Sequence, residues 1–193
     1  RISAMGFGCM GLNHHRSQHP DDKACIRLVH EAIERGVTLF DTAESYGYHA
    51  NEILTGKALK GYADRVFATT KFGHKFVNGV QVRTEEDSTP ANIRRVCENS
   101  LRNLGVETLG IFYQHRIDPG TPIEVVAETV GELIKEGKIN PELIIAVPVG
   151  FVNVVQSKEL ILSLEDTPSI VARGRKGGSN IAACICNALL YQM

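Results

Sequence analysis

The strongest constraint on the fold is an alternation of short apolar runs and amphipathic helical segments over residues 1–139. The apolar runs are nearly continuous, which is typical of strands that are covered on both faces. Each strand–helix unit spans about 30 residues or more, the usual size of a βαβ unit. The pattern therefore predicts an α/β fold with a parallel sheet, and both an open doubly wound sheet and a closed eight-fold barrel are compatible with it.

Start and stop signals locate the predicted elements. The predicted helices cover residues 21–35, 51–60, 90–104 and a segment that ends before Gly137. The last of these begins at Thr121-Pro122-Ile123-Glu124, which has the form of a capping box with Pro in the first turn. The predicted strands cover residues 37–42, 65–71, 109–115 and 143–149, and a Gly-punctuated run covers residues 5–12.

Three successive predicted strands end in titratable residues. These residues are Asp41, Lys71 and His115, and Tyr46 follows in the loop that leaves the first of these strands. The carboxyl ends of parallel strands lie at one edge of a sheet, where α/β folds place their active sites. We therefore expect the four side chains to converge at one rim.

This set of side chains suits one kind of chemistry. A Tyr hydroxyl has a pKa of about 10, and an ammonium group beside it favours the phenolate and so makes the hydroxyl a better proton donor. A carboxylate can hold that ammonium in place, and an imidazole can polarise a substrate carbonyl. The set therefore favours protonation of a carbonyl oxygen while hydride reaches its carbon, and the hydride must come from a nicotinamide or flavin cofactor.

Five segments together resemble the aldo-keto reductase superfamily, in the branch related to plant carbonyl reductases and potassium-channel β-subunits. They are Gly6–Leu12 (GFGCMGL), Phe40–Gly47 (FDTAESYG), Asn51–Leu59 (NEILTGKAL), Ala68–Gly73 (ATTKFG) and Phe112–Asp118 (FYQHRID). The resemblance covers about residues 5–139. It implies a (β/α)8 TIM barrel that uses NADPH (NADP+) to reduce aldehydes and ketones.

The resemblance also implies roles for individual residues. Its catalytic tetrad corresponds to Asp41, Tyr46, Lys71 and His115, and its cofactor-binding positions correspond to Gly8, Cys9, Met10 and Asp41. In the channel β-subunits the His position can be Asn, so His115 favours an enzyme. The alternative is a catalytically impaired nucleotide-binding or regulatory protein that resembles a channel β-subunit.

The length of the chain is the main departure from this family. A (β/α)8 barrel takes about 250 residues, whereas this chain has 193. We expect a single aldo-keto-reductase-like domain over residues 1–193, with an incomplete or truncated barrel. Residues 140–193 would then be degenerate later barrel units. The alternative is that this tail is unrelated sequence.

Composition excludes several classes of partner. The net charge is −1, so no global field favours nucleic acid. No apolar run reaches the roughly 18 residues of a membrane span, and the first residues lack a signal-peptide pattern. Five scattered cysteines and the absence of metal-ligand spacing predict reduced thiols, no metal site and a cytoplasmic location. We expect a small-molecule carbonyl substrate, and homo-oligomerisation stays open.

Overall fold

The computed structural model describes most of the chain as two compact units, Arg1–Asn140 and Pro141–Met193. The described residues are 3–14, 18–141, 144–147, 154–163, 167–178, 180–182, 184–185 and 188.

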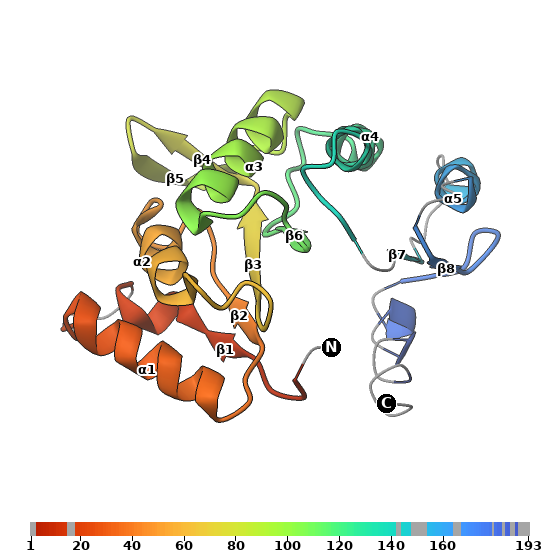
Figure 1. Cartoon of the computed structure of the whole chain (residues 1–193). Coiled ribbons are helices and arrows are strands. Elements are labelled where there is room, and N and C mark those ends of the chain that lie inside the picture. Colours follow the sequence, from red (N-terminus) through yellow and green to blue (C-terminus); the bar gives the residue numbers. More distant parts are fainter. Residues whose placement is uncertain are drawn as a thin grey trace. The chain divides into compact units, whose positions relative to one another are not determined.

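The first unit is built on a four-stranded parallel sheet (Figure 1). In sheet order its strands are β1 (Phe7–Gly8), β2 (Leu39–Asp41), β3 (Phe67–Phe72) and β6 (Ile111–Gln114). This order follows the chain without a reversal, whereas a doubly wound sheet reverses its strand order at a switch point. The strand order therefore favours the barrel over the open sheet, a choice that the sequence pattern left undecided.

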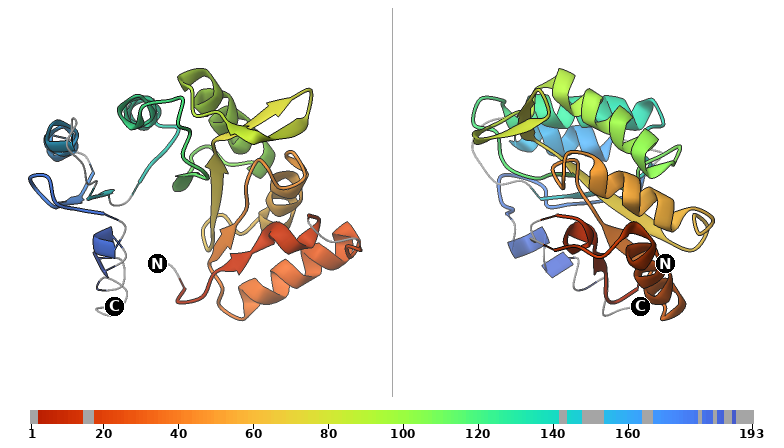
Figure 2. Two further views of the ribbon diagram at one scale, coloured as in Figure 1. Left: turned by 180° about the vertical axis from the view of Figure 1, so that it is seen from behind. Right: turned by 90° about the vertical axis from the view of Figure 1, so that its left-hand side faces the viewer.

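A helix follows each of these strands. The helices are α1 (Asp22–Glu34), α2 (Ala50–Leu59), α3 (Pro90–Leu104) and α4 (Ile123–Lys135). Each helix packs against the next one along the chain, and the right-hand view of Figure 2 shows α1, α2 and α3 side by side over one face of the sheet. A row of neighbouring helices on one side of a parallel sheet is the arrangement of a (β/α)8 barrel wall.

Local capping sets the ends of two of these helices. The side chain of Asp21 accepts a hydrogen bond from the backbone N–H of Ala24 at 2.7 Å and so caps α1. The side chain of Thr89 caps α3, Pro90 is its first residue, and Gly105 ends it with a φ of 69°. That left-handed conformation is one that Gly adopts without a steric penalty.

The predicted capping box of α4 is wrong. The residue at its N-cap position is Pro122, and no side-chain hydrogen bond caps the helix. The hydroxyl of Thr121 instead donates to Asp118 Oδ2 at 2.6 Å. The carboxylate of Asp118 also accepts backbone N–H groups from Ser88 and Gly120. Because the carboxylate of Asp118 is a charged and therefore stronger acceptor, the Thr121 hydroxyl forms its hydrogen bond within the loop and does not cap the helix.

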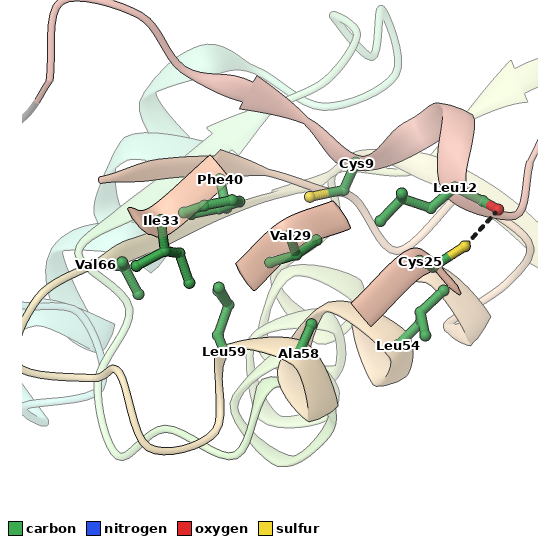
Figure 3. Close-up of a cluster of buried hydrophobic side chains, with 10 residues drawn as sticks. All are labelled: Cys9, Leu12, Cys25, Val29, Ile33, Phe40, Leu54, Ala58, Leu59 and Val66. Atoms are coloured by element: carbon green, nitrogen blue, oxygen red, sulfur yellow. Dashed lines mark hydrogen bonds between the residues drawn. The ribbon is translucent and has the colours of Figure 1, made fainter. Parts of the chain in front are cut away.

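Buried apolar side chains form two clusters that hold the helices to the sheet. The first lies between α1, α2 and the strands β1 and β2 (Figure 3), and its members are Cys9, Leu12, Cys25, Val29, Ile33, Phe40, Leu54, Ala58, Leu59 and Val66. The second is formed by Phe72, Ile93, Val96, Cys97, Leu104, Leu109, Val126, Leu133 and Ile139. The four described cysteines are free thiols, as expected.

Helices α2 and α3 approach each other closely. A Cβ atom at Gly56 would lie 2.4 Å from the carbonyl oxygen of Asn103, so only Gly fits there. Nearby, the fully buried carboxylate of Glu52 accepts hydrogen bonds from the hydroxyls of Thr70 and Ser100, both at 2.6 Å. This buried polar group therefore joins α2 to both β3 and α3, with its hydrogen-bonding capacity satisfied.

An antiparallel hairpin that the sequence analysis did not predict follows β3. Its strands are β4 (His74–Val77) and β5 (Val80–Glu86). The turn residues Asn78 and Gly79 both have positive φ values, 50° and 79°. An Asn-Gly pair with this geometry is the preferred turn of a two-residue hairpin, so Asn78-Gly79 is the signal that could have revealed it.

The sheet of the first unit continues only briefly beyond β6. Leu109 and Ile139 form an isolated parallel bridge, and the backbone N–H of Asn140 donates to the carbonyl of Leu109 at 3.1 Å. Parallel pairing thus extends to Ile139, next to the end of the first unit at Asn140.

The second unit contains a small βαβ motif. Strand β7 (Ile144–Ala146) pairs in parallel with β8 (Ser169–Val171), and α5 (Val154–Leu162) lies between them in the chain. The fully buried Lys158 of α5 donates to the carbonyls of Gly174 and Lys176 at 2.8 and 2.7 Å. Strand β8 was not predicted. Among the described helices, none has the length and apolarity that a membrane span requires.

Candidate active site

The backbone of the sheet brings the predicted site residues to one rim. Asp41 is the last residue of β2, and it pairs with Thr69 in β3. Lys71 lies two residues further along β3. The backbone N–H of His115 donates to the carbonyl of Phe72 at 2.7 Å, which places His115 directly after β6. The parallel register therefore sets three strand ends side by side, as expected.

The ammonium of Lys71 is the centre of the site. Its Nζ donates to Asp41 Oδ2 at 2.7 Å, to the carbonyl oxygen of Thr42 at 2.6 Å and to the hydroxyl of Tyr46 at 3.4 Å. These three acceptors match the three N–H groups of an ammonium. The Lys71 side chain is 13% exposed and that of Asp41 is 39% exposed. The charge pair is thus partly shielded from water, with its geometry set by a backbone carbonyl as well as by the carboxylate.

A second residue fixes the carboxylate. The hydroxyl of Thr69 donates to Asp41 Oδ1 at 2.6 Å, so each oxygen of Asp41 has one strong donor. The sequence analysis missed Thr69. Its signal is the two-residue spacing from Lys71, because alternate residues of a strand point to the same face of the sheet.

Tyr46 lies between Lys71 and two imidazole rings. The centroid of its ring is 5.8 Å from that of His115 in an edge-to-face arrangement, and 5.8 Å from that of His14 in a stacked one. The Nζ of Lys71 is 4.9 Å from the Tyr46 ring centroid, within the range of a cation–π contact. Its phenol is therefore held by aromatic contacts, while its hydroxyl is directed to the ammonium.

His115 is neutral at physiological pH. Burial lowers the pKa of its imidazole to about 4, and positive charges at His74, Lys71 and Arg116 act in the same direction. Its Nδ1 is 3.5 Å from the hydroxyl oxygen of Ser45. A neutral imidazole keeps one N–H donor and one acceptor nitrogen, so His115 can direct a hydrogen bond to a carbonyl oxygen without carrying charge.

The three predicted cofactor-binding residues of β1 and the turn after it occupy different environments. Gly8 is exposed, and the space where a Cβ would lie has no atom within 4 Å. Met10 is 37% exposed. The side chain of Cys9 is fully buried in the first core cluster (Figure 3), and burial raises the pKa of its thiol to about 12. Of the three, Gly8 and Met10 therefore present surface to a ligand, and Cys9 has only its backbone available.

The histidines near the rim have different surroundings. Within the described part of the chain, no group of three His, Cys, Asp or Glu residues could hold a metal ion. Of the histidines near the rim, His74 contacts His115, with ring centroids 4.6 Å apart. His49, in contrast, is directed to the buried Glu52, with its Nδ1 3.4 Å from Oε2.

Two family models match the chain. The model of the Aldo/keto reductase family matches residues 4–141, and that of Precorrin-8X methylmutase matches residues 124–192. The first match spans the first structural unit, and the second lies mainly on the second unit.

Solved structures with the same architecture include several bacterial enzymes. Aldo-keto reductase AKR11C1 from Bacillus halodurans (holo form) is 25% identical with a TM-score of 0.64, over 88% of this chain and 61% of that chain. Glycerol dehydrogenase AKR11B4 from Gluconobacter oxydans is 28% identical with a TM-score of 0.66, over 86% of this chain and 50% of that one. An aldo/keto reductase from Klebsiella pneumoniae in complex with NADP and acetate is 26% identical with a TM-score of 0.58, over 82% and 50%. This chain thus covers between half and about three fifths of these three structures.

Proposed function

The chain belongs to the aldo/keto reductase family, and on that premise we propose that it reduces the carbonyl of an aldehyde or ketone with hydride from NADPH. Its fold is accordingly part of a (β/α)8 barrel. The observation that carries the proposal is the single ammonium of Lys71, which donates to both Asp41 and Tyr46 at the carboxyl rim of the sheet.

In this proposal Tyr46 is the proton donor. As its hydroxyl gives a proton to the carbonyl oxygen, negative charge develops on the phenol oxygen, 3.4 Å from the Lys71 ammonium. A preorganised positive charge at that distance stabilises the transition state more than the ground state. Asp41 holds the ammonium in position, and Thr69 in turn holds Asp41.

His115 orients the substrate in this proposal. Its ring lies edge-to-face against Tyr46, so a hydrogen-bond donor and the proton donor face the same region of the rim. Because burial keeps the imidazole neutral, it polarises the carbonyl without adding a second full positive charge beside Lys71.

The residues of the first unit suit the reactive end of a nicotinamide cofactor. The exposed backbone at Gly8 and the exposed side chain of Met10 lie at the carboxyl end of β1, which pairs with β2 at Asp41. These residues, with the backbone of Cys9 and the carboxylate of Asp41, would hold it there. When bound, NADPH supplies the hydride. Two related solved structures are named with NADP or NADPH, which supports this choice of cofactor.

The branch of the family, the choice of an enzyme over a regulatory protein and the class of substrate are also proposals. The motif at residues 40–47 and the Ala-Thr-Thr-Lys-Phe-Gly run support the branch related to plant carbonyl reductases and channel β-subunits. The presence of His115 favours the enzyme over the silent nucleotide-binding protein. We propose a small-molecule carbonyl as the substrate, and the cytoplasmic location stays a prediction.

The organisation of residues 140–193 has two interpretations. A single domain over residues 1–193 stays a prediction. The division of contacts at residue 140 and the second family match support the alternative, in which the tail is unrelated to the barrel. The structural matches to aldo-keto reductases cover 88% and 86% of this chain, more than the first unit, and they support the single domain. We assign the proposed chemistry to the first unit.

The test compares two neighbouring tyrosines. In the proposal, Tyr46→Phe removes the proton donor and lowers kcat for an aromatic aldehyde by about 100-fold or more, measured by the loss of NADPH absorbance. Tyr48→Phe is the matched control, because Tyr48 lies in the same loop and packs on Phe76 of the hairpin. Its kcat should stay within about twofold of the parent.

Cofactor binding separates the alternatives. A titration that follows NADPH fluorescence should show binding to the parent and to both variants, since the Tyr46 hydroxyl is not a cofactor contact. Equal kcat values for the parent and Tyr46→Phe would refute the role of Tyr46. Binding of NADPH without turnover in the parent would instead support the catalytically impaired alternative.

A further inference from the structure

A second histidine contacts the proposed active site from the hairpin. His74, the first residue of β4, packs on His115 with ring centroids 4.6 Å apart and an interplanar angle of 55°. Its Nδ1 lies 2.6 Å from Oε2 of Glu86, the last residue of β5. A carboxylate can only accept, so Nδ1 of His74 carries the proton and donates it to this bond.

The backbone sets this contact. Gly73 joins β3 to β4 with a φ of +115°, and a Cβ there would lie 3.2 Å from the carbonyl oxygen of Arg116. On the other side of the turn, His74 pairs with Glu86 in the hairpin register. The chain therefore turns sharply at a residue that favours glycine, and the turn delivers His74 next to His115 with its carboxylate partner already opposite.

We propose that His74, held by Glu86, is a positioning residue that fixes the ring of His115 at the rim of the sheet. This inference rests on the proposed function, because it deepens the role given there to His115. The ring of His115 is placed between two other rings, Tyr46 at 5.8 Å and His74 at 4.6 Å. The hydroxyl of Ser45 lies 3.5 Å from its Nδ1. Without His74, one side of the ring loses its aromatic neighbour.

Most of the charges around His115 lower the pKa of its imidazole. Besides burial, positive charge at His74, Lys71 and Arg116 lowers the pKa of His115, and the carboxylate of Asp41 opposes them. His74 therefore acts on His115 through charge as well as through the ring contact, and both place it beside the imidazole that faces the substrate.

The first test measures the pKa of His115 by NMR titration of its imidazole in the full chain without substrate. The signal is assigned by its loss in His115→Gln. In His74→Gln the pKa of His115 should rise by about half a pH unit or more, because the coulombic contribution of His74 that lowers this pKa is removed. A change smaller than the scatter among control variants would overturn the electrostatic part of the role.

The second test removes the carboxylate that holds His74 and leaves both imidazole rings in place. Glu86→Ala should lower kcat for the carbonyl substrate by about tenfold, with the KM for NADPH unchanged, because the His115 ring is no longer held. Glu85→Ala is the matched control: Glu85 precedes Glu86 in β5 and pairs with the exposed Lys75 instead. Its kcat should match that of the parent.

The two tests also separate this inference from the proposed function. If the parent shows no turnover, the proposed function fails, and the titration of His115 alone decides the inference. If the parent is active and neither the pKa of His115 nor kcat differs from the Glu85→Ala control, the positioning role is refuted. Should His74→Gln fail to fold, as judged by circular dichroism, the titration is made on Glu86→Ala, and an unchanged His115 signal refutes the role.

Discussion

Replacing His115 with Gln should make the first unit less sensitive to acid. The folded chain holds this imidazole neutral, with its pKa lowered to about 4 from an ordinary value of 6.5, chiefly by burial. The unfolded chain therefore binds more protons than the folded chain below about pH 6.5. Consequently the stability associated with the neutral ring is present above that pH and is lost as the pH falls towards about 4.

The magnitude follows from the two pKa values. At about pH 5 the linkage relation gives a loss of about 2 kcal/mol for a fully shielded ring, and the partial exposure of His115 reduces this to about 1–2 kcal/mol. Groups that do not interact with His115 contribute equally in both proteins, so their contributions cancel in the comparison. His115→Gln should therefore lose about 1–2 kcal/mol less of its unfolding free energy between about pH 7.5 and pH 5 than the parent does.

Urea unfolding at several pH values tests this prediction. The chain has no Trp, so far-ultraviolet circular dichroism follows the transition, and hydrogen exchange in α3 identifies the unfolding of the first unit. The difference in unfolding free energy between the parent and His115→Gln should therefore change by about 1–2 kcal/mol between about pH 7.5 and pH 5. Parallel loss of stability in the two proteins across this range would show that His115 titrates normally, and it would refute the argument that the site holds it neutral.

Three further substitutions test the packing and the ion pair. Gly56→Ala should reduce the unfolding free energy by about 1–3 kcal/mol, since the new Cβ would meet the backbone of α3; no loss in urea unfolding would mean that the two helices separate easily. Gly131→Ala, in α4 with open space around the new methyl group, should raise the unfolding free energy by about 0.5–1 kcal/mol in the same assay. Asp41→Asn should lower kcat by about 10- to 100-fold, because the Lys71 ammonium loses a charged acceptor; an unchanged kcat at saturating NADPH would contradict the role of Asp41.

Much of the first unit could be predicted because its signals are local. The cap at Asp21, the Pro at residue 90 and the Gly at residue 105 act through hydrogen bonds and φ angles within one turn of their helices. The strand ends at Asp41, Lys71 and His115 follow from short apolar runs that stop at a polar residue. The capping box at Thr121 failed because a competing acceptor, Asp118, lies nearby in the folded loop.

Other features depended on contacts that a sequence pattern does not encode. The hairpin at residues 74–86 carries its own turn signal, yet its importance comes from placing His74 against His115, residues that are 41 positions apart in the printed sequence. The role of Thr69 likewise depends on the pairing of β2 with β3, which brings its hydroxyl to the Asp41 carboxylate. Such long-range partners are chosen by strand register rather than by local propensity.

The amino-acid sequence sufficed to predict a parallel α/β sheet and a rim with an acid, a Tyr, a Lys and a His, because periodicity and strand ends are properties of neighbouring residues. Periodicity alone could not choose between the open sheet and the barrel, although the resemblance to the aldo-keto reductases implied the barrel. Strand order settled that choice, because the order β1-β2-β3-β6 arises from pairing between distant segments. Folding also set the protonation state and the hydrogen bonds of the site. Burial keeps His115 neutral, and the backbone carbonyl of Thr42 is one of the three hydrogen-bond acceptors of the Lys71 ammonium. Desolvation and hydrogen-bond geometry arise only when the chain has packed, and they fix the positions and charges of the four side chains relative to one another.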